Sequence, residues 1–366
     1  MEISLRPGHD VPDIFVERMQ TRALGEQVLA TTMSIDFSNN PIVDGLVAHG
    51  LPEDILAVDY YGHANGPSAL LLGHHGHHEA RTEFERNFPG SYVVLGEPEH
   101  DKYYEGKVVH RSHIKALAVG SRVLSLGGVN FINFGYDHFV DALLDFESVE
   151  FTDFLTSFIA QNGNLRGRAQ AGEQFALTEQ SSVLVDYGKN HQSFIMERLL
   201  ADLGEDGVQA ATMSSSYAPA GRLYRSLHGI AEAGKPVTIY TNHASKFQGS
   251  HASMLEEEMQ GEELAYIALG SLGRQYCVTI IDSLPQGTFN HFKAMVIEKE
   301  AGNKVAYMLS HNMHPLSVRF GTAEVALRTT DPAVIEQIAG FIEDNLALSS
   351  ARPLAHSFDE GGVANR

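Results

Sequence analysis

Residues 290–300 read NHFKAMVIEKE, and residues 112–122 read SHIKALAVGSR. Each segment carries a histidine and a lysine two positions apart, followed by alanine and an apolar run. Side chains at i and i+2 of a strand point to the same face, so each copy predicts an imidazole beside an ammonium group. The recurrence is either a coincidence or a sign that the two segments form two halves of one site. The rest of the chain distinguishes these two interpretations.

Other segments recur at nearly the same spacing. Four pairs of matching residues or segments occur in the same order in the two halves of the chain, at offsets of 178 to 183 residues. One match could arise by chance, but four in order predict a duplicated unit. The pairs are VLATTMS (28–34) with VQAATMS (208–214), His113 with His291, Asn130 with Asn312, and FIAQN (158–162) with FIEDN (341–345).

The predicted secondary structure repeats in the same way. In each half, helices alternate with strands, the His-x-Lys segment is placed on an apolar strand followed by another strand, and an amphipathic helix comes last, with Asp331 as N-cap of the second. This alternation predicts an α/β sandwich in each half, hence two pseudo-symmetric α/β sandwich domains in one chain. Helices are expected over 12–27, from Asn40-Pro41, and over 193–207 and 220–234; strands are expected over 28–34, 55–61, 121–128, 208–217, 236–242 and 303–309.

Chain length and composition suit this organisation. With 366 residues, the chain can bury a large core, and we expect domains over 1–165 and 175–350. The polar, glycine-rich segment 161–174 is predicted to be the linker, and residues 351–366 are predicted to be a loose tail.

The charge and the terminal sequences bear on the class of protein. The apolar fraction of 43% is ordinary. The formal charge of −20 argues against non-specific binding to nucleic acid or to anionic lipid, although adaptation to a salty habitat would also explain this charge. The charge does not exclude a local basic patch inside a site. The start lacks a secretory pattern, no apolar run is long enough to cross a bilayer, and the single cysteine, Cys277, cannot form an internal disulfide. We therefore expect a soluble cytoplasmic protein.

At these residues the chain resembles the phospholipase D superfamily, which is named for a duplicated His-x-Lys-x4-Asp motif. The resemblance covers both halves. The first copy is His113-x-Lys115, with Gly120 at the place of the aspartate, and the second is His291-x-Lys293, with Glu298 there. The family's Gly/Ser-x-Asn element matches Gly128-x-Asn130 and Ser310-x-Asn312. A carboxylate about a dozen residues farther on matches Asp141 and Glu324, with Asp137 and Asp145 competing with Asp141.

The resemblance implies two phospholipase D-like domains and a role for each of these residues. His113 is expected to be the nucleophile and His291 the general acid and then base, although the two could be exchanged. Lys115, Lys293, Asn130 and Asn312 are expected to bind phosphate, with Glu324 orienting His291 and Asp141 orienting His113. The resemblance implies no cofactor and no metal.

The chemistry has a physical logic of its own. Neutral imidazole is a good nucleophile near pH 7, and a covalent phosphohistidine divides one hard displacement into two easier ones. A second imidazole on the opposite side can protonate the leaving oxygen. Lysine and asparagine can hold the charge on the phosphate oxygens.

Gly120 is the main departure from the family pattern. The family's aspartate is expected to support the lysine, so its loss puts the positioning of Lys115 in doubt, and Glu298 is a milder change. The alternative is a degenerate protein whose first half is only a scaffold.

A histidine-rich segment, GHHGHHEAR (73–81), could bind a transition metal through His74 to His78 or could be a solvated loop. Basic residues near the first motif suit an anionic substrate or form an ordinary strand edge; they are Lys107, His110, Arg111 and Arg122. Three further histidines without a motif are expected to be packed or solvated; they are His138, His243 and His314.

These observations predict a phospholipase D-type phosphodiesterase or phosphatidyltransferase acting on a phospholipid. The expected partner is therefore a phosphodiester, with at most peripheral membrane contact, and a monomer could be complete because both halves lie in one chain. A nuclease-type phosphodiesterase of the same superfamily is the first alternative, against which the charge argues. A non-catalytic binding or scaffold protein is the second.

Overall fold

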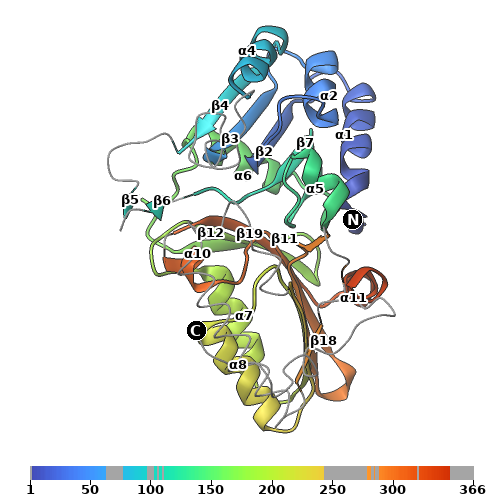
Figure 1. Ribbon diagram of the computed structural model, residues 1–366, viewed down its shortest axis with the longest axis vertical. Coiled ribbons are helices and arrows are strands. Elements are labelled where there is room, and N and C mark those ends of the chain that lie inside the picture. The colour runs from blue at the N-terminus through green and yellow to red at the C-terminus, as the bar shows by residue number, and fades with distance from the viewer. Residues whose placement is uncertain are drawn as a thin grey trace, which may run out of the picture.

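The computed structural model describes residues 2–62, 77–96, 103–104, 107–108, 111–242, 278–281, 284, 288–319 and 321–346. Within these ranges, one large mixed sheet lies in each half of the chain (Figure 1). The first sheet contains β1 (Ser4–Pro7), β2 (Val28–Ser34), β3 (Ile55–Gly62), β4 (Ser91–Leu95), β7 (Ala116–Val119), β8 (Arg122–Ser125) and β10 (Ala142–Glu147). The second contains β11 (Gly172–Ala176), β12 (Ser181–Tyr187), β13 (Val208–Ser214), β14 (Val237–Tyr240), β15 (Val278–Ile281), β17 (Ala294–Lys299), β18 (Lys304–Leu309) and β19 (Ala323–Thr329).

The two sheets have the same topology. The first has the order β1-β10-β8-β7-β2-β3-β4, and the second has the order β11-β12-β19-β18-β17-β13-β14-β15. Apart from β11, each strand of one sheet has a counterpart at the same place in the other. The predicted α/β class and the pseudo-symmetric duplication are therefore confirmed.

Helices cover both faces of each sheet and create three cores. The helices α1 (Val11–Gln20), α2 (Pro41–His49) and α4 (His77–Asn87) pack on the outer face of the first sheet, and α7 (Phe194–Gly204) and α8 (Gly221–Glu232) pack on the outer face of the second. The helices α6 (Val149–Ala160) and α11 (Pro332–Leu346) contribute to a third core that contains buried residues of both sheets. Because the two halves share this core, they form one body.

Local sequence signals explain several element boundaries. The helix α2 begins at Pro41 as expected, and the side chain of Asn40 caps it by accepting hydrogen bonds from the backbone amides of Ile42 and Val43. Asp331 likewise accepts from the amide of Ala333 at the start of α11. Two expectations are wrong in extent: the first helix ends at Gln20, and the linker is shorter than 161–174 because β11 begins at Gly172.

The His-x-Lys segments lie just before strands rather than on them, since β7 and β17 begin at the alanine that follows each lysine. Here the two halves are joined by two short parallel pairings. The strand β9 (Phe139–Val140) pairs with β16 (Phe289–Asn290), and Ser112 forms an isolated bridge with Ala323. Each pairing therefore sets one half's motif histidine, the next residue, beside the other half's carboxylate residue.

The remaining described elements are short: β5 (Tyr103–Tyr104), β6 (Lys107–Val108), α5 (Asn133–His138), α10 (Pro315–Arg319) and the 3-10 helices η1 (Gly8–Asp10) and η3 (Glu300–Gly302). None of the helices within the described ranges has the length and apolar character needed to span a bilayer.

Candidate active site

Each of the two motif histidines is hydrogen-bonded to a carboxylate from the opposite half. The Nδ1 atom of His113 lies 3.0 Å from Oε2 of Glu324, and Nδ1 of His291 lies 2.5 Å from Oδ2 of Asp141. The expected pairing of Glu324 with His291 and of Asp141 with His113 is therefore wrong: the pairs are exchanged. The parallel pairings are the reason, since the amide of His113 donates to the carbonyl of Ala323 and that of His291 to the carbonyl of Val140.

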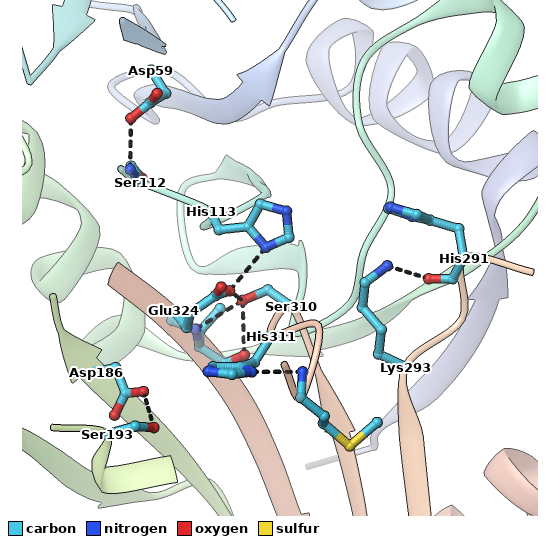
Figure 2. Close-up of polar contacts among 12 residues, drawn as sticks. Asp59, Ser112, His113, Asp186, Ser193, His291, Lys293, Ser310, His311 and Glu324 are labelled. Carbon is cyan, nitrogen blue, oxygen red and sulfur yellow. Dashed lines mark hydrogen bonds and ion pairs between the residues drawn. The ribbon is translucent and has the colours of Figure 1, made fainter. Parts of the chain in front are cut away.

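Both imidazoles are held in one tautomer. A carboxylate that accepts from Nδ1–H leaves Nε2 as the basic nitrogen. His113 is 5% exposed, and the ring of His291 stacks on that of Phe139 with centroids 5.1 Å apart. Figure 2 shows the ring of His113 above Glu324, with His291 and Lys293 across the site. Each half thus offers one oriented nucleophilic nitrogen.

The electrostatic surroundings keep both imidazoles neutral at pH 7. Burial, with Lys115 and Lys293 nearby, holds the pKa of His113 well below its usual value. Burial and Lys293 lower the pKa of His291 to about 4, although Asp141 opposes the shift. Because a lysine of the second motif acts on the histidine of the first, the two motifs belong to one centre.

The two motif lysines are buried cations. Burial lowers the pKa of Lys293 to about 8, and its ammonium donates to the backbone carbonyl of His291. Lys115 is fully buried, burial holds its pKa well below the usual value, and its Nζ has no hydrogen-bond acceptor within the described part of the chain. An anionic ligand would supply the missing acceptor oxygens and favour the protonated form of this buried amine.

Asn130 and Asn312 each lie two residues after the first residue of the Gly/Ser-x-Asn element, which is Gly128 or Ser310. Asn130 is 7% exposed, and the side-chain oxygens of Asn130 and Asn312 are buried without a hydrogen-bond partner among the described residues. The hydroxyl of Ser215 donates to the backbone carbonyl of Asn312. Neither amide oxygen has a partner within the described part of the chain.

Gly128 and Ser310 support the carboxylates in different ways. A Cβ atom at Gly128 would lie 2.6 Å from Oδ2 of Asp141 and 2.8 Å from Nζ of Lys293. Only glycine fits there without displacing charged groups. In the other half, the hydroxyl of Ser310 donates to Oε2 of Glu324 at 2.5 Å and accepts from the amide of Val325. The sequence placed both residues in the motif but gave no role to either.

Two residues that sequence reasoning missed anchor the segments ahead of the motifs. Oδ2 of Asp59 accepts from the amide of Ser112 at 2.6 Å (Figure 2), and Oδ1 of Asn242 accepts from the amide of Asn290 at 2.7 Å. Asp59 and Asn242 lie 183 residues apart, which is an offset of the internal repeat and could have identified them.

Gly120 and Glu298 are distant from the lysines of their motifs. Each follows its lysine by five residues along a strand, roughly 16 Å at about 3.3 Å per residue. Gly120 follows β7 with a φ of 60°, a conformation suited to glycine, and the half-buried Glu298 pairs with Lys304 at 2.8 Å. The expectation that Gly120 affects the positioning of Lys115 is therefore wrong.

Other candidates fall outside the centre or outside the described residues. Asp145 pairs with Arg6 and Arg18, so Asp141 is the carboxylate of the first half. The described residues contain no group of three or more side chains arranged to hold a metal ion. The His74–His78 cluster, Lys107, His110, Asp137, His243 and Cys277 lie, wholly or in their side chains, outside the described residues.

Several solved structures are similar to the whole chain. The phosphatidylserine synthase of Haemophilus influenzae Rd KW20 is 14% identical, with a TM-score of 0.68 over 97% of this chain and 88% of that one. The polyphosphate kinase of Porphyromonas gingivalis is 11% identical, with a TM-score of 0.58 over 93% of this chain and 49% of that one. A mutant of the yeast tyrosyl-DNA phosphodiesterase is 8% identical, with a TM-score of 0.53 and 90% of each chain covered. Neither a family model nor a curated protein matches the sequence.

Proposed function

The chain has the duplicated α/β fold of the phospholipase D superfamily, and from this premise we propose that it is a phosphodiesterase or phosphatidyltransferase that acts through a phosphohistidine. One observation carries the proposal: two imidazoles, each oriented by a carboxylate of the opposite half, share a centre with two buried lysines. Such an arrangement has a nucleophile, a proton carrier and cations for phosphate, which are the groups that the reaction needs.

In the first step, Nε2 of His113 attacks phosphorus, and the bond from phosphorus to the leaving oxygen breaks. His291 gives its Nε2 proton to that oxygen. In the second step, His291 takes a proton from water or an alcohol, which attacks phosphorus and breaks the bond to His113. The two lysines and the two asparagine amides hold the phosphate oxygens through both steps.

The low pKa of His291, about 4 in the free protein, bears on its role as an acid. The neighbouring ammonium group of Lys293 is among its causes, and a phosphodiester anion bound to the lysines offsets that charge. Substrate binding therefore raises the pKa of His291 toward neutrality, so that the protonated acid forms when the substrate is present.

We propose a phospholipid as the substrate, without a metal ion in the reaction. The formal charge of −20 disfavours a long polyanion, and the first structural relative named above is a phosphatidylserine synthase. The charge argues against a nucleic acid, and the structural relative supports a phospholipid.

Intact-mass spectrometry tests the proposal after brief incubation with phosphatidyl lipids, bis(4-nitrophenyl) phosphate or oligonucleotides. A phosphatidyl adduct on His113 is expected in the wild type. In His291→Ala, the adduct from bis(4-nitrophenyl) phosphate should accumulate, because nitrophenolate leaves without a proton while the second step is blocked. His113→Ala should lower turnover by about 10³-fold or more, and turnover should survive a chelator. An adduct formed only with oligonucleotides would identify a nuclease, and turnover unchanged in His113→Ala would refute the mechanism.

A further inference from the structure

A groove of about 460 Å³ lies between α7, α8 and α10, outside the set of catalytic residues. Figure 1 places α10 beside α7, close to where the two halves meet. The volume falls within the range of about 300–1,000 Å³ that is usual for small-molecule sites. The floor consists of aliphatic and thioether side chains from all three helices and the segment before α10: Met196, Leu200, Leu223, Met313 and Val318.

The groove is connected to the centre through the backbone. Met313 follows Asn312 directly, lines the groove, and donates its amide hydrogen to Nδ1 of His311 at 2.7 Å. His314 also lines the groove, and its Cα lies at most about 7–8 Å from that of Asn312, since consecutive Cα atoms are about 3.8 Å apart. The lining of the groove therefore begins at the residue that follows Asn312.

The rim of the groove is positive. Arg222 forms an ion pair with Glu197, and Arg225 and Arg319 add two further positive charges. This local excess is notable in a chain with a formal charge of −20. An apolar floor below a cationic rim is complementary to the apolar chain of a lipid that carries a net negative charge.

The lining residues disfavour a nucleic acid as the occupant. Proteins that bind single strands stack bases on aromatic rings, and none of the described residues that line the groove is Phe, Tyr or Trp. We propose that the groove binds an acyl chain of an anionic phospholipid whose phosphate lies between the two histidines. This inference rests on the function proposed above, and it assigns the choice of substrate to the second half of the chain.

Calorimetry on the full chain tests this assignment with two phosphate monoesters, dioctanoyl phosphatidic acid below its micellar concentration and glycerol 3-phosphate. The lipid should bind at least about tenfold more tightly, and its affinity should rise by about fourfold for each further methylene that is buried. Leu200→Asp and Val318→Asp, at two half-buried floor positions on different helices, should each reduce the ratio of the two affinities by about tenfold.

The rim has a matched control on α7. Arg225→Glu should weaken lipid binding, whereas Arg198→Glu makes the same charge change at an exposed residue outside the groove and should leave lipid binding unaltered. Equal affinities for the two monoesters in the wild type, or a ratio that is unaltered in folded Leu200→Asp and Val318→Asp, would overturn the proposal. The proposal would also be overturned if the groove variants weakened the binding of an oligonucleotide as much as the binding of the lipid.

Turnover of bis(4-nitrophenyl) phosphate, which has no acyl chain, separates the two proposals. Normal turnover with equal affinities for the two monoesters would refute the acyl groove alone. Absence of turnover with a preserved affinity ratio would refute the catalytic proposal and support the groove as a lipid site.

Discussion

At the scale of single residues, the two carboxylates of the site have unlike supports. Gly128 leaves just enough space for Asp141 and Lys293, whereas Ser310 donates a hydrogen bond to Glu324. The carboxylate that orients His291 therefore depends on a missing side chain, and the carboxylate that orients His113 depends on a hydroxyl.

Gly128→Ala should disable the site. The added methyl group would lie 2.6 Å from Oδ2 of Asp141, so the carboxylate must move and His291 loses its orientation. We expect kcat to fall by about 10²-fold or more, because a shift of about 1 Å in a catalytic group has that effect. Gly340→Ala is the control, since a Cβ atom there meets nothing within 4 Å. Wild-type kcat in Gly128→Ala would contradict the role of this residue.

The lowered pKa of Lys293, about 8, predicts a pH dependence of substrate binding. As the pH rises through about 8, Lys293 loses its proton and the site loses a cation, so KM should increase above that pH. Lys293→Arg should remove this dependence even if turnover falls, because guanidinium does not titrate in this range. A KM that stays constant to pH 10 in the wild type would refute the assignment of the cation.

The sequence located the catalytic candidates because the motif recurs at a nearly constant offset. Of the eight, six are linked in the structure by hydrogen bonds or by mutual effects on pKa: His113, Lys115, Asp141, His291, Lys293 and Glu324. The exchange of the carboxylates could not be predicted, because it depends on pairings between segments more than 140 residues apart in the chain.

At the scale of secondary-structure elements, a buried carboxylate joins β12 to the start of α7. Asp186 accepts hydrogen bonds from the hydroxyl of Ser193, which is the N-cap of α7, and from the amide of Ile195 (Figure 2 shows the first). It also lies opposite Glu324 in the pairing of β12 with β19. Burial raises the pKa of Asp186 to about 7, and Glu324 adds to the shift.

Asp186→Asn should stabilise the protein at alkaline pH. In the unfolded chain the carboxyl ionises near its usual pKa of 3.8, whereas in the folded chain it stays protonated up to about pH 7, so stability falls as the pH rises between these values. The amide stays neutral: its oxygen can accept from the amide of Ile195, and its NH2 group can donate to the hydroxyl of Ser193. We expect the free energy of unfolding to rise on the order of 3 kcal/mol at pH 8 and to change little at pH 4.

Urea denaturation at both pH values would measure this effect. Asp153→Asn, on the exposed side of α6, is the control and should show no such difference between pH 4 and pH 8. If wild type and Asp186→Asn had equal free energies of unfolding at pH 8, ionisation of Asp186 would not destabilise the folded protein, and the prediction would be wrong.

Long elements were predicted better than short ones. The strands β2 and β18 follow from apolar runs, and the starts of α2 and α11 follow from local capping residues. The two-residue strands β9 and β16 carry no periodic pattern, and their existence depends on the partner strand of the other half. These short strands position His291, so the sequence pattern was least informative where the site is assembled.

At the scale of the whole molecule, the shared core makes the linker dispensable after folding. The central core combines side chains of α6, α11 and both sheets, and the two parallel pairings add hydrogen bonds between the halves. Residues 161–171 join the halves covalently, but the contacts that hold the site lie elsewhere.

A protease site inserted at Gly167, where a Cβ atom would meet nothing within 4 Å, tests this. Cleavage of the folded protein should leave its turnover within about twofold of the uncut sample and its elution volume unchanged, since a cut in an exposed segment alters few contacts. An uncleaved sample carried through the same incubation is the control. Separation of the fragments without denaturant would contradict the single-body arrangement.

The exchanged carboxylates also have a consequence for ancestry. A half-length protein could have built the same centre as a symmetric homodimer, with each copy lending its acid to the other's imidazole. Such a pair would be bound to stay identical, because a single gene encodes both sides. Tandem fusion removes that constraint, and this chain already has glycine opposite serine and aspartate opposite asparagine at equivalent positions. Under the proposed mechanism, divergence of the two copies would let one side of a phosphorus atom specialise in attack and the other in departure.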